Sequence, residues 1–195
     1  MKKKAYYKHI ESIYYTEQNI RLATYFYNEV KKFFDYKVDL AYEIGCGYGV
    51  AASCFKELAA HFVLVDTDLN ALGYVKSKFG NACSTQTDFT ITQHPDLIYF
   101  FMSLHHIQEF HRVIENAVNY IFKNNAIIAI CEIEPNPTVV FHKKEPCPYD
   151  GLKKSDFNWI KENYHFIKSS YIDLPSIEAH NTSFNCYCLI LSKEE

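Results

Sequence analysis

Hydrophobic and polar residues alternate in different ways along the chain. Over residues 5–35, apolar side chains recur every three or four positions, as on one face of an amphipathic helix, and no glycine or proline interrupts them. Over residues 38–133, short and continuously apolar runs alternate with segments of helical period. Beyond a stretch crowded with prolines, residues 155–164 again have helical period, and two apolar runs follow without a helix between them. The pattern predicts N-terminal helices, then alternating strands and helices, then a strand pair.

The middle region predicts a parallel sheet. Continuously apolar strands that are joined by helices are typical of a parallel sheet with both faces covered. The two final apolar runs, residues 166–172 and 184–191, are expected to pair antiparallel. The fold class is therefore α/β, with a doubly wound and mostly parallel sheet. The expected strands of the middle region are residues 38–44, 62–65, 82–87, 97–102 and 126–133, and the helices between them are residues 50–60, 70–79 and 109–123.

Length and charge narrow the classes of function. A chain of 195 residues has the size of one domain. Its 20 basic and 23 acidic residues leave a net charge of -3, and the only arginines are Arg21 and Arg112. Nucleic-acid binders usually carry a basic excess or a basic stripe. A nucleic-acid partner is therefore not expected.

Cysteine usage and hydropathy indicate the compartment. Seven cysteines occur with no Cys-x-x-Cys pair and no signal peptide before them, which favours reduced thiols in a cytoplasmic protein. Cys186 and Cys188 are two positions apart on an expected strand, so both should face the same side of the core. No apolar run approaches the roughly 18 residues of a transmembrane helix, so no membrane span is expected.

A glycine-rich turn follows the first expected strand. Residues 43–49 read Glu-Ile-Gly-Cys-Gly-Tyr-Gly. Glycines permit a tight turn that brings backbone N–H groups to a ligand at a helix N-terminus. The spacing is one residue shorter than the Gly-x-Gly-x-x-Gly of dinucleotide folds, and no P-loop lysine follows. Asp66 ends the second expected strand, where a carboxylate can accept hydrogen bonds from both ribose hydroxyls.

These residues resemble the motifs of the class I S-adenosylmethionine (SAM)-dependent methyltransferases. Residues 43–49 are similar to the first motif of that family, although Tyr48 stands where Thr or Ser is common. The resemblance covers about residues 37–192 and implies a Rossmann-like, seven-stranded sheet with an antiparallel last strand. The other matching segments are Asp66, residues 87–89 (Thr-Asp-Phe), residues 96–107 around the fourth strand and residues 132–137 (Glu-Ile-Glu-Pro-Asn-Pro) after the fifth.

The resemblance also implies which residues hold the cofactor. The glycine loop would cradle the methionyl part of SAM, Glu43 would orient its ammonium group, and Asp66 would bind the ribose. Asp88 would reach the adenine amine and Phe89 would touch the ring. The cofactor residues expected in this way are Glu43, Gly45, Cys46, Gly47, Gly49, Asp66, Thr67, Asp88, Phe89 and Ser103.

The same resemblance suggests how the chain is divided. Residues 37–195 would form the SAM-binding domain, and residues 1–36 would cover it as a helical lid, with tyrosines that offer faces to a sulfonium or a flat substrate. The whole would be a single compact domain, as a monomer or a homodimer.

Catalytic candidates follow the fourth and fifth strands. His105 and His106 lie at the carboxyl end of a parallel strand, where ligands bind, and an imidazole can take a proton near neutrality. Glu134 is a further candidate, and both Glu134 and Glu132 can instead support other site residues. His142, Glu145 and Cys147 have no standard zinc spacing with these histidines, so no metal is expected.

The sequence therefore predicts an enzyme that moves a methyl group from SAM to an O or N atom of a small molecule or short peptide, leaving S-adenosylhomocysteine. After the fourth strand it lacks the Asn/Asp-Pro-Pro-Tyr/Phe of adenine and glutamine methyltransferases and the Pro-Cys of cytosine C5 enzymes. An RNA or protein methyltransferase of the same fold is one alternative, and a non-catalytic SAM-binding protein is another. The glycine spacing disfavours a nicotinamide-dependent oxidoreductase.

Overall fold

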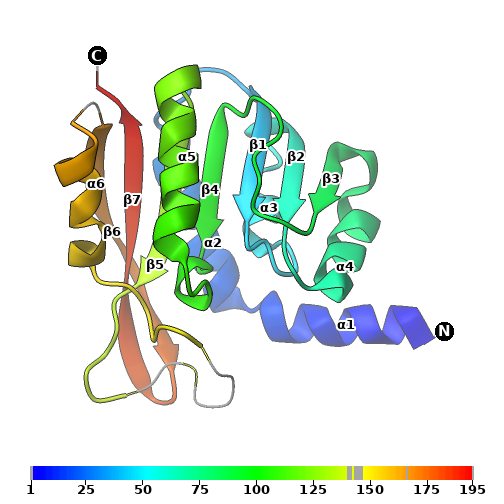
Figure 1. Cartoon of the computed structure of the whole chain (residues 1–195). Coiled ribbons are helices and arrows are strands. Elements are labelled where there is room, and N and C mark those ends of the chain that lie inside the picture. The colour runs from blue at the N-terminus through cyan, green and yellow to red at the C-terminus, as the bar shows by residue number, and fades with distance from the viewer. Residues whose placement is uncertain (1, 140–141, 143–146, 166, 195) are drawn as a thin grey trace.

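The computed structural model describes residues 2–139, 142, 147–165 and 167–194. These residues form a seven-stranded sheet with helices on both of its faces (Figure 1). The strands are β1 (Val38–Ile44), β2 (Ala59–Val65), β3 (Cys83–Gln86), β4 (Leu97–Phe101), β5 (Ile127–Ile133), β6 (Ile167–Ala179) and β7 (Thr182–Lys193). The helices are α1 (Lys2–Tyr14), α2 (Glu17–Lys31), α3 (Val50–Phe55), α4 (Leu69–Phe79), α5 (Phe110–Asn124) and α6 (Asn158–Asn163), with 3₁₀ turns η1 (Gly80–Ala82), η2 (Leu104–His106) and η3 (Lys154–Phe157).

The strand order confirms the predicted fold class. The order across the sheet is β3-β2-β1-β4-β5-β7-β6. Strands β1 to β5 are parallel, and β7 runs antiparallel between β5 and β6. The order reverses between β1 and β4, which makes their carboxyl ends the place where a doubly wound fold binds ligands.

The core lies in two layers, one on each face of the sheet. Along β4, Leu97 and Tyr99 belong to the layer that α2, α3 and α4 cover, whereas Ile98 and Phe100 belong to the layer under α5 and α6. Strand β7 alternates in the same way, so Cys186 and Cys188 lie in one layer, as their spacing predicted. All seven cysteines are among the described residues, and no disulfide joins any two of them. The alternation is the two-residue period of a strand that is buried on both faces.

Two predicted helices differ from those in the structure. The helix expected over residues 50–60 ends at Phe55, because Ala59 already pairs with Val38 in the parallel ladder. The helix expected from Ser155 begins as the turn η3, and its α-helical part starts only at Asn158. The sequence prediction was wrong at both points because sheet pairing and the turn override local helix preference.

Strands β6 and β7 are also longer than the apolar runs that predicted them. They extend as a two-stranded arm beyond the ends of the parallel strands (Figure 1). The arm contacts α2, where the side-chain amide of Gln18 exchanges two hydrogen bonds with the backbone of Glu178, at 3.2 and 2.9 Å. This contact brings the N-terminal helices to the same end of the molecule as the arm.

The N-terminal helical region is broken between α1 and α2, at Thr16. The Thr16 hydroxyl accepts a hydrogen bond of 3.2 Å from the backbone N–H of Asn19, which caps α2. None of the described helices is both long and apolar enough to cross a bilayer.

Replacing the Thr16 cap should destabilise the fold. We expect Thr16→Ala to lower the free energy of unfolding by about 1 kcal/mol, because an N–H group at the start of α2 loses its partner. Thr16→Ser keeps the hydroxyl and should restore most of the loss. Urea unfolding of both variants measures the difference, and an equal loss in the serine variant would rule out the cap as its cause.

Candidate functional site

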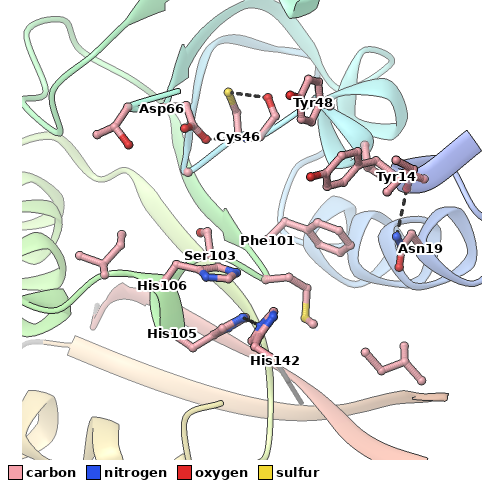
Figure 2. A pocket seen from close by; sticks show the side chains of 18 of the residues that line it. Tyr14, Asn19, Cys46, Tyr48, Asp66, Phe101, Ser103, His105, His106 and His142 are labelled. Carbon is pink, nitrogen blue, oxygen red and sulfur yellow. Dashed lines mark hydrogen bonds between the residues drawn. The ribbon is translucent and has the colours of Figure 1, made fainter. Parts of the chain in front are cut away.

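A cavity of about 700 Å³ lies where the parallel strands end. The first residues after β1, β2 and β4 all line it: Gly45, Asp66 and Met102. Figure 2 shows Asp66 and Cys46 at one end of this space and His105, His106 and His142 at the other, with Ser103 between them. The cavity therefore sits at the crevice that the sheet order predicts.

The glycine loop is clamped between two strands. The backbone N–H groups of Gly45 and Cys46 donate to the carbonyl of Val65, at 2.8 and 2.9 Å. On the other side, the Ser103 hydroxyl donates to the Ile44 carbonyl at 2.8 Å. Gly45 has a φ of +71°, and a side chain there would place its Cβ 2.5 Å from Ser103 Cβ. Only glycine permits this approach.

Asp66 faces the cavity and also supports the loop. Its Oδ2 accepts from the Gly47 N–H at 2.7 Å, and its Oδ1 accepts from the Asp68 N–H at 2.9 Å. Asp68, rather than Asp66, caps α4 by accepting from the Asn70 N–H at 2.8 Å. Asp68 therefore caps the helix, whereas Asp66 lines the cavity.

A buried carboxylate organises the opposite end of the cavity. Glu132, at the end of β5, is fully buried. Its Oε1 accepts from the Leu104 N–H at 2.8 Å, and its Oε2 lies 2.6 Å from His105 Nδ1. Met102, just before this turn, has a φ of +53°, a conformation rare outside glycine. The Glu132 hydrogen bonds and the left-handed backbone at Met102 thus hold the turn η2 in place, and both of its histidines line the cavity.

Three imidazole rings meet at this end. His105 Nε2 lies 3.0 Å from His142 Nε2, and the rings of His105 and His106 have their centroids 4.3 Å apart. Cys147 Sγ lies 3.3 Å from His106 Nδ1. Burial, together with the neighbouring His105 and His142, lowers the pKa of His106 to about 4. His106 is therefore neutral at pH 7 and a weaker base than an ordinary histidine.

The N-terminal helices form another wall. Ile13 and Tyr14 of α1 line the cavity, and the Tyr14 ring lies 4.6 Å from the Tyr48 ring. The Tyr15 hydroxyl donates to the carbonyl oxygens of Tyr48 and Gly49, at 2.7 and 2.9 Å. These contacts tie the N-terminal region directly to the glycine loop (Figure 2 shows Tyr14 beside Tyr48).

Comparison with known proteins settles the family. A family model described as a methyltransferase domain matches residues 41–184, which is well over half of the chain. The chain belongs to the class I SAM-dependent methyltransferases. SAM is the methyl donor of this family. No curated protein matches the chain significantly.

Solved structures agree on the fold. The N-methyltransferase NodS from Bradyrhizobium japonicum WM9, in complex with S-adenosyl-L-homocysteine, is 14% identical with a TM-score of 0.66, over 97% of this chain and 98% of that one. A SAM-dependent methyltransferase from Aquifex aeolicus is 13% identical with a TM-score of 0.65, over 95% and 97%. The YcgJ protein from Bacillus subtilis is 11% identical with a TM-score of 0.63, over 88% and 99%. At these identities the likeness shows the fold alone.

Most of the residues expected from the sequence lie on the wall of this cavity. These are Gly45, Cys46, Gly47, Asp66, Thr67, Phe89, Ser103, His105 and His106. Met102 and Asn19, which the sequence did not single out, join them, and so does His142. His142 was considered only as a metal ligand and set aside, because spacing along the chain gives no sign that the fold brings it to His105.

Two expected cofactor residues lie behind the loop, outside the residues that line the cavity. Glu43 is buried, and the Tyr99 hydroxyl donates to its Oε2 at 2.9 Å. Gly49 is the residue just before α3, and a Cβ there would meet Val75 and Phe79 at 2.9 Å. Glu43 is therefore hydrogen-bonded to β4, and Gly49 packs closely against α4.

Two other expected residues also lie outside the cavity lining. The Asp88 carboxylate accepts from the Thr90 N–H at 2.8 Å within its own turn. Glu134 follows β5, and its backbone N–H donates to the Asn185 carbonyl at 2.9 Å, which continues the sheet pairing. A sequence motif locates such residues along the chain without indicating the direction of their side chains.

Glu43 should make the stability of the protein depend on pH. Burial raises the pKa of Glu43 from 4.5 to about 8, while hydrogen bonds from Tyr99 and Ala52 lower it and the Asp66 charge adds to the rise. The folded state keeps this proton to a higher pH than the unfolded chain does. The free energy of unfolding should therefore fall as pH rises from about 4.5 to 8, by at most about 1.4 kcal/mol per pH unit from this group.

Glu43→Gln removes this titration, so the difference in unfolding free energy between native protein and variant should change with pH across that window. Urea unfolding at several pH values measures it, with the exposed Glu57→Gln as the matched control. A difference that stays constant with pH for Glu43→Gln would contradict the raised pKa.

The approach of Gly45 to Ser103 makes a second prediction. Gly45→Ala should cost about 2 kcal/mol or more of stability, from the clash with Ser103 and the left-handed backbone. Gly47→Ala shares the left-handed backbone, with a φ of +48°, but its Cβ would meet nothing within 4 Å, so it should cost less. In a Ser103→Gly background the Gly45→Ala penalty should shrink. Additive penalties in this double-mutant cycle would contradict the steric explanation.

Proposed function

We propose that this methyltransferase transfers the methyl group of SAM to an O or N atom of a small molecule or short peptide, inside the cavity described above. The main observation in support of this proposal is that a single cavity has the glycine loop and Asp66 at one end and the His105–His106 turn at the other. A volume of about 700 Å³ falls within the range of small-molecule sites. It can take the cofactor and a modest acceptor together.

The cofactor end offers the groups that SAM requires. The loop of Gly45, Cys46 and Gly47 presents backbone to the methionyl part, and the Asp66 carboxylate keeps lone pairs for the ribose hydroxyls. Phe89 and Thr67 line the same space and suit the adenine side. Gly49 and Glu43 would act through the loop, and Asp88 through the turn that carries Phe89.

The acceptor end of the cavity has a mostly apolar lining with a few polar groups.

Methyl transfer breaks the bond between the sulfonium sulfur and the methyl carbon as the acceptor lone pair forms the new bond, and the acceptor's proton leaves to a base or to water. Such an in-line step depends mainly on alignment and on exclusion of water. The apolar part of the wall, which would exclude water, includes Tyr14, Phe101 and Ile107. The polar groups that would contact the acceptor are His105 and His106.

The charge of the cavity favours a small acceptor over RNA. No lysine or arginine is among the described residues that line it. A phosphate backbone requires such residues, because its affinity comes largely from cationic contacts. The aromatic and aliphatic lining instead suits a hydroxylated or amino compound with an apolar body.

Binding and turnover test the proposal in sequence. Calorimetric titration with SAM, S-adenosylhomocysteine and NADH should give micromolar affinity for the first two and none for NADH. Transfer of the radiolabelled methyl group of SAM is then measured with pools of phenols, amines, short peptides and RNA. Labelling confined to RNA would overturn the acceptor class, and tight SAM binding without transfer to any pool would favour a non-catalytic role.

Asp66 should govern cofactor affinity. Asp66→Ala should weaken SAM binding by about 1–3 kcal/mol, roughly 5- to 150-fold, because it removes a charged hydrogen-bond acceptor. Asp68→Asn is the control, because it removes a neighbouring charge while keeping an equally good helix cap. Calorimetry on folded variants measures both. Unchanged affinity in Asp66→Ala would contradict the assignment.

A further inference from the structure

Four side chains of the kinds that bind metal ions converge at the acceptor end of the cavity. They come from two segments that are far apart in the chain. His105 and His106 lie in the turn η2 after β4, whereas His142 and Cys147 follow β5. One potential ligand atom of each residue lies within 4.8 Å of those of all the others. Figure 2 shows the three histidine rings gathered at this end. The proposed function uses these rings only as polar walls and does not explain their convergence.

The distances approach those of a tetrahedral site. Zinc–nitrogen bonds of about 2.0–2.1 Å and a zinc–sulfur bond of about 2.3 Å place neighbouring ligand atoms roughly 3.3–3.6 Å apart. Here His105 Nε2 and His142 Nε2 are 3.0 Å apart, and His106 Nδ1 and Cys147 Sγ are 3.3 Å apart. Cys147 Sγ also lies 2.9 Å from the carbonyl oxygens of His105 and Tyr149, so a bound ion has to draw the sulfur toward the rings.

The hydrogen bonds of Glu132 prepare His105 as a ligand. This carboxylate accepts from the backbone N–H groups of Leu104 and His105, at 2.8 and 3.3 Å, so it acts as an acceptor and His105 Nδ1 must donate to it. The lone pair of neutral His105 is then on Nε2, the atom that faces His142. A carboxylate that fixes the ring and tautomer of a ligating histidine is a regular companion of protein-bound zinc.

We propose that His105, His106, His142 and Cys147 bind one divalent transition-metal ion of the zinc class. Imidazole and thiolate ligands select zinc, cobalt or nickel over magnesium and calcium, which prefer oxygen. The ion joins the segment after β5 to the turn after β4, two parts of the cavity wall that the chain does not connect directly.

The ion would also face the acceptor. His105, His106 and His142 line the cavity, whereas Cys147 does not, so the exposed side of the ion opens onto the cavity. Zinc can expand its coordination from four to five ligands, so an acceptor oxygen or nitrogen can bind there. Contact between the ion and the acceptor rests on the proposed function, whereas metal binding itself does not.

Metal binding is tested on the full chain without a polyhistidine tag. Protein stripped with a chelator is titrated with Zn²⁺ by calorimetry and with Co²⁺ by visible absorption. We expect one ion per chain, a tetrahedral Co²⁺ spectrum and a thiolate-to-cobalt charge-transfer band. SAM is titrated into the same samples. A protein that binds SAM but takes up no stoichiometric metal overturns the metal site, whereas metal uptake without SAM binding overturns only the proposed function.

Variants locate the ion. His106→Ala and His142→Ala should each raise the Zn²⁺ dissociation constant at least 10-fold, and Cys147→Ser should abolish the charge-transfer band. His105 is left unchanged, because its removal would strand the buried Glu132 carboxylate. His94→Ala and Cys54→Ser, outside the cluster, are the matched controls and should leave both readouts unchanged. Native affinity in both histidine variants would overturn the proposal.

Discussion

The site depends on the close approach of Gly45 and Ser103, which joins the carboxyl ends of β1 and β4. The Ser103 hydroxyl reaches the Ile44 carbonyl, and the absent side chain of Gly45 leaves the space that Ser103 fills. Because the strand order reverses here, this contact sets the glycine loop beside the turn that carries His105. A contact between the short Ser103 side chain and the backbone at Ile44 and Gly45 therefore holds the two ends of the cavity together. In-line methyl transfer needs that kind of rigidity.

Two buried carboxylates hold the two ends in different ways. Glu43 lies under the glycine loop, where burial outweighs the donors Tyr99 and Ala52 and raises its pKa to about 8. Glu132 instead receives backbone N–H groups and the His105 ring together. A buried charge with several donors is well compensated, whereas one with few donors favours its neutral form. The loop is thus supported by a group that can lose its charge, and the histidine turn by an ordered set of hydrogen bonds.

The sequence could predict features that depend on residues close together in the chain. The sheet follows from the apolar runs and was confirmed, and the glycines at fixed spacing lie in the turn after β1 with positive φ. The end of α3 was missed, because Ala59 joins a strand only when Val38 is beside it. Family motifs located Glu43 and Asp88 along the chain, but a linear motif does not show whether a side chain lines the cavity, and neither residue is among those that line it.

The acceptor end was harder to predict because its parts meet only in three dimensions. His142 and Cys147 lie 36 or more positions beyond His106, and no local pattern links them. The same is true of the N-terminal wall. Tyr14 packs against Tyr48, the Asn19 amide donates to the Tyr14 carbonyl, and the neighbouring Gln18 binds the β6–β7 arm.

Long-range contacts join the N-terminal helices to the glycine loop. The Tyr15 hydroxyl binds the carbonyl oxygens of Tyr48 and Gly49, and it lies one residue after the end of α1. A shift of the loop on cofactor binding must therefore move or strain the junction between α1 and α2. Because Tyr14 and Asn19 border the acceptor space, the same shift reshapes that space. The Tyr15 hydrogen bonds thus couple the position of the glycine loop to the part of the cavity wall that Tyr14 and Asn19 form.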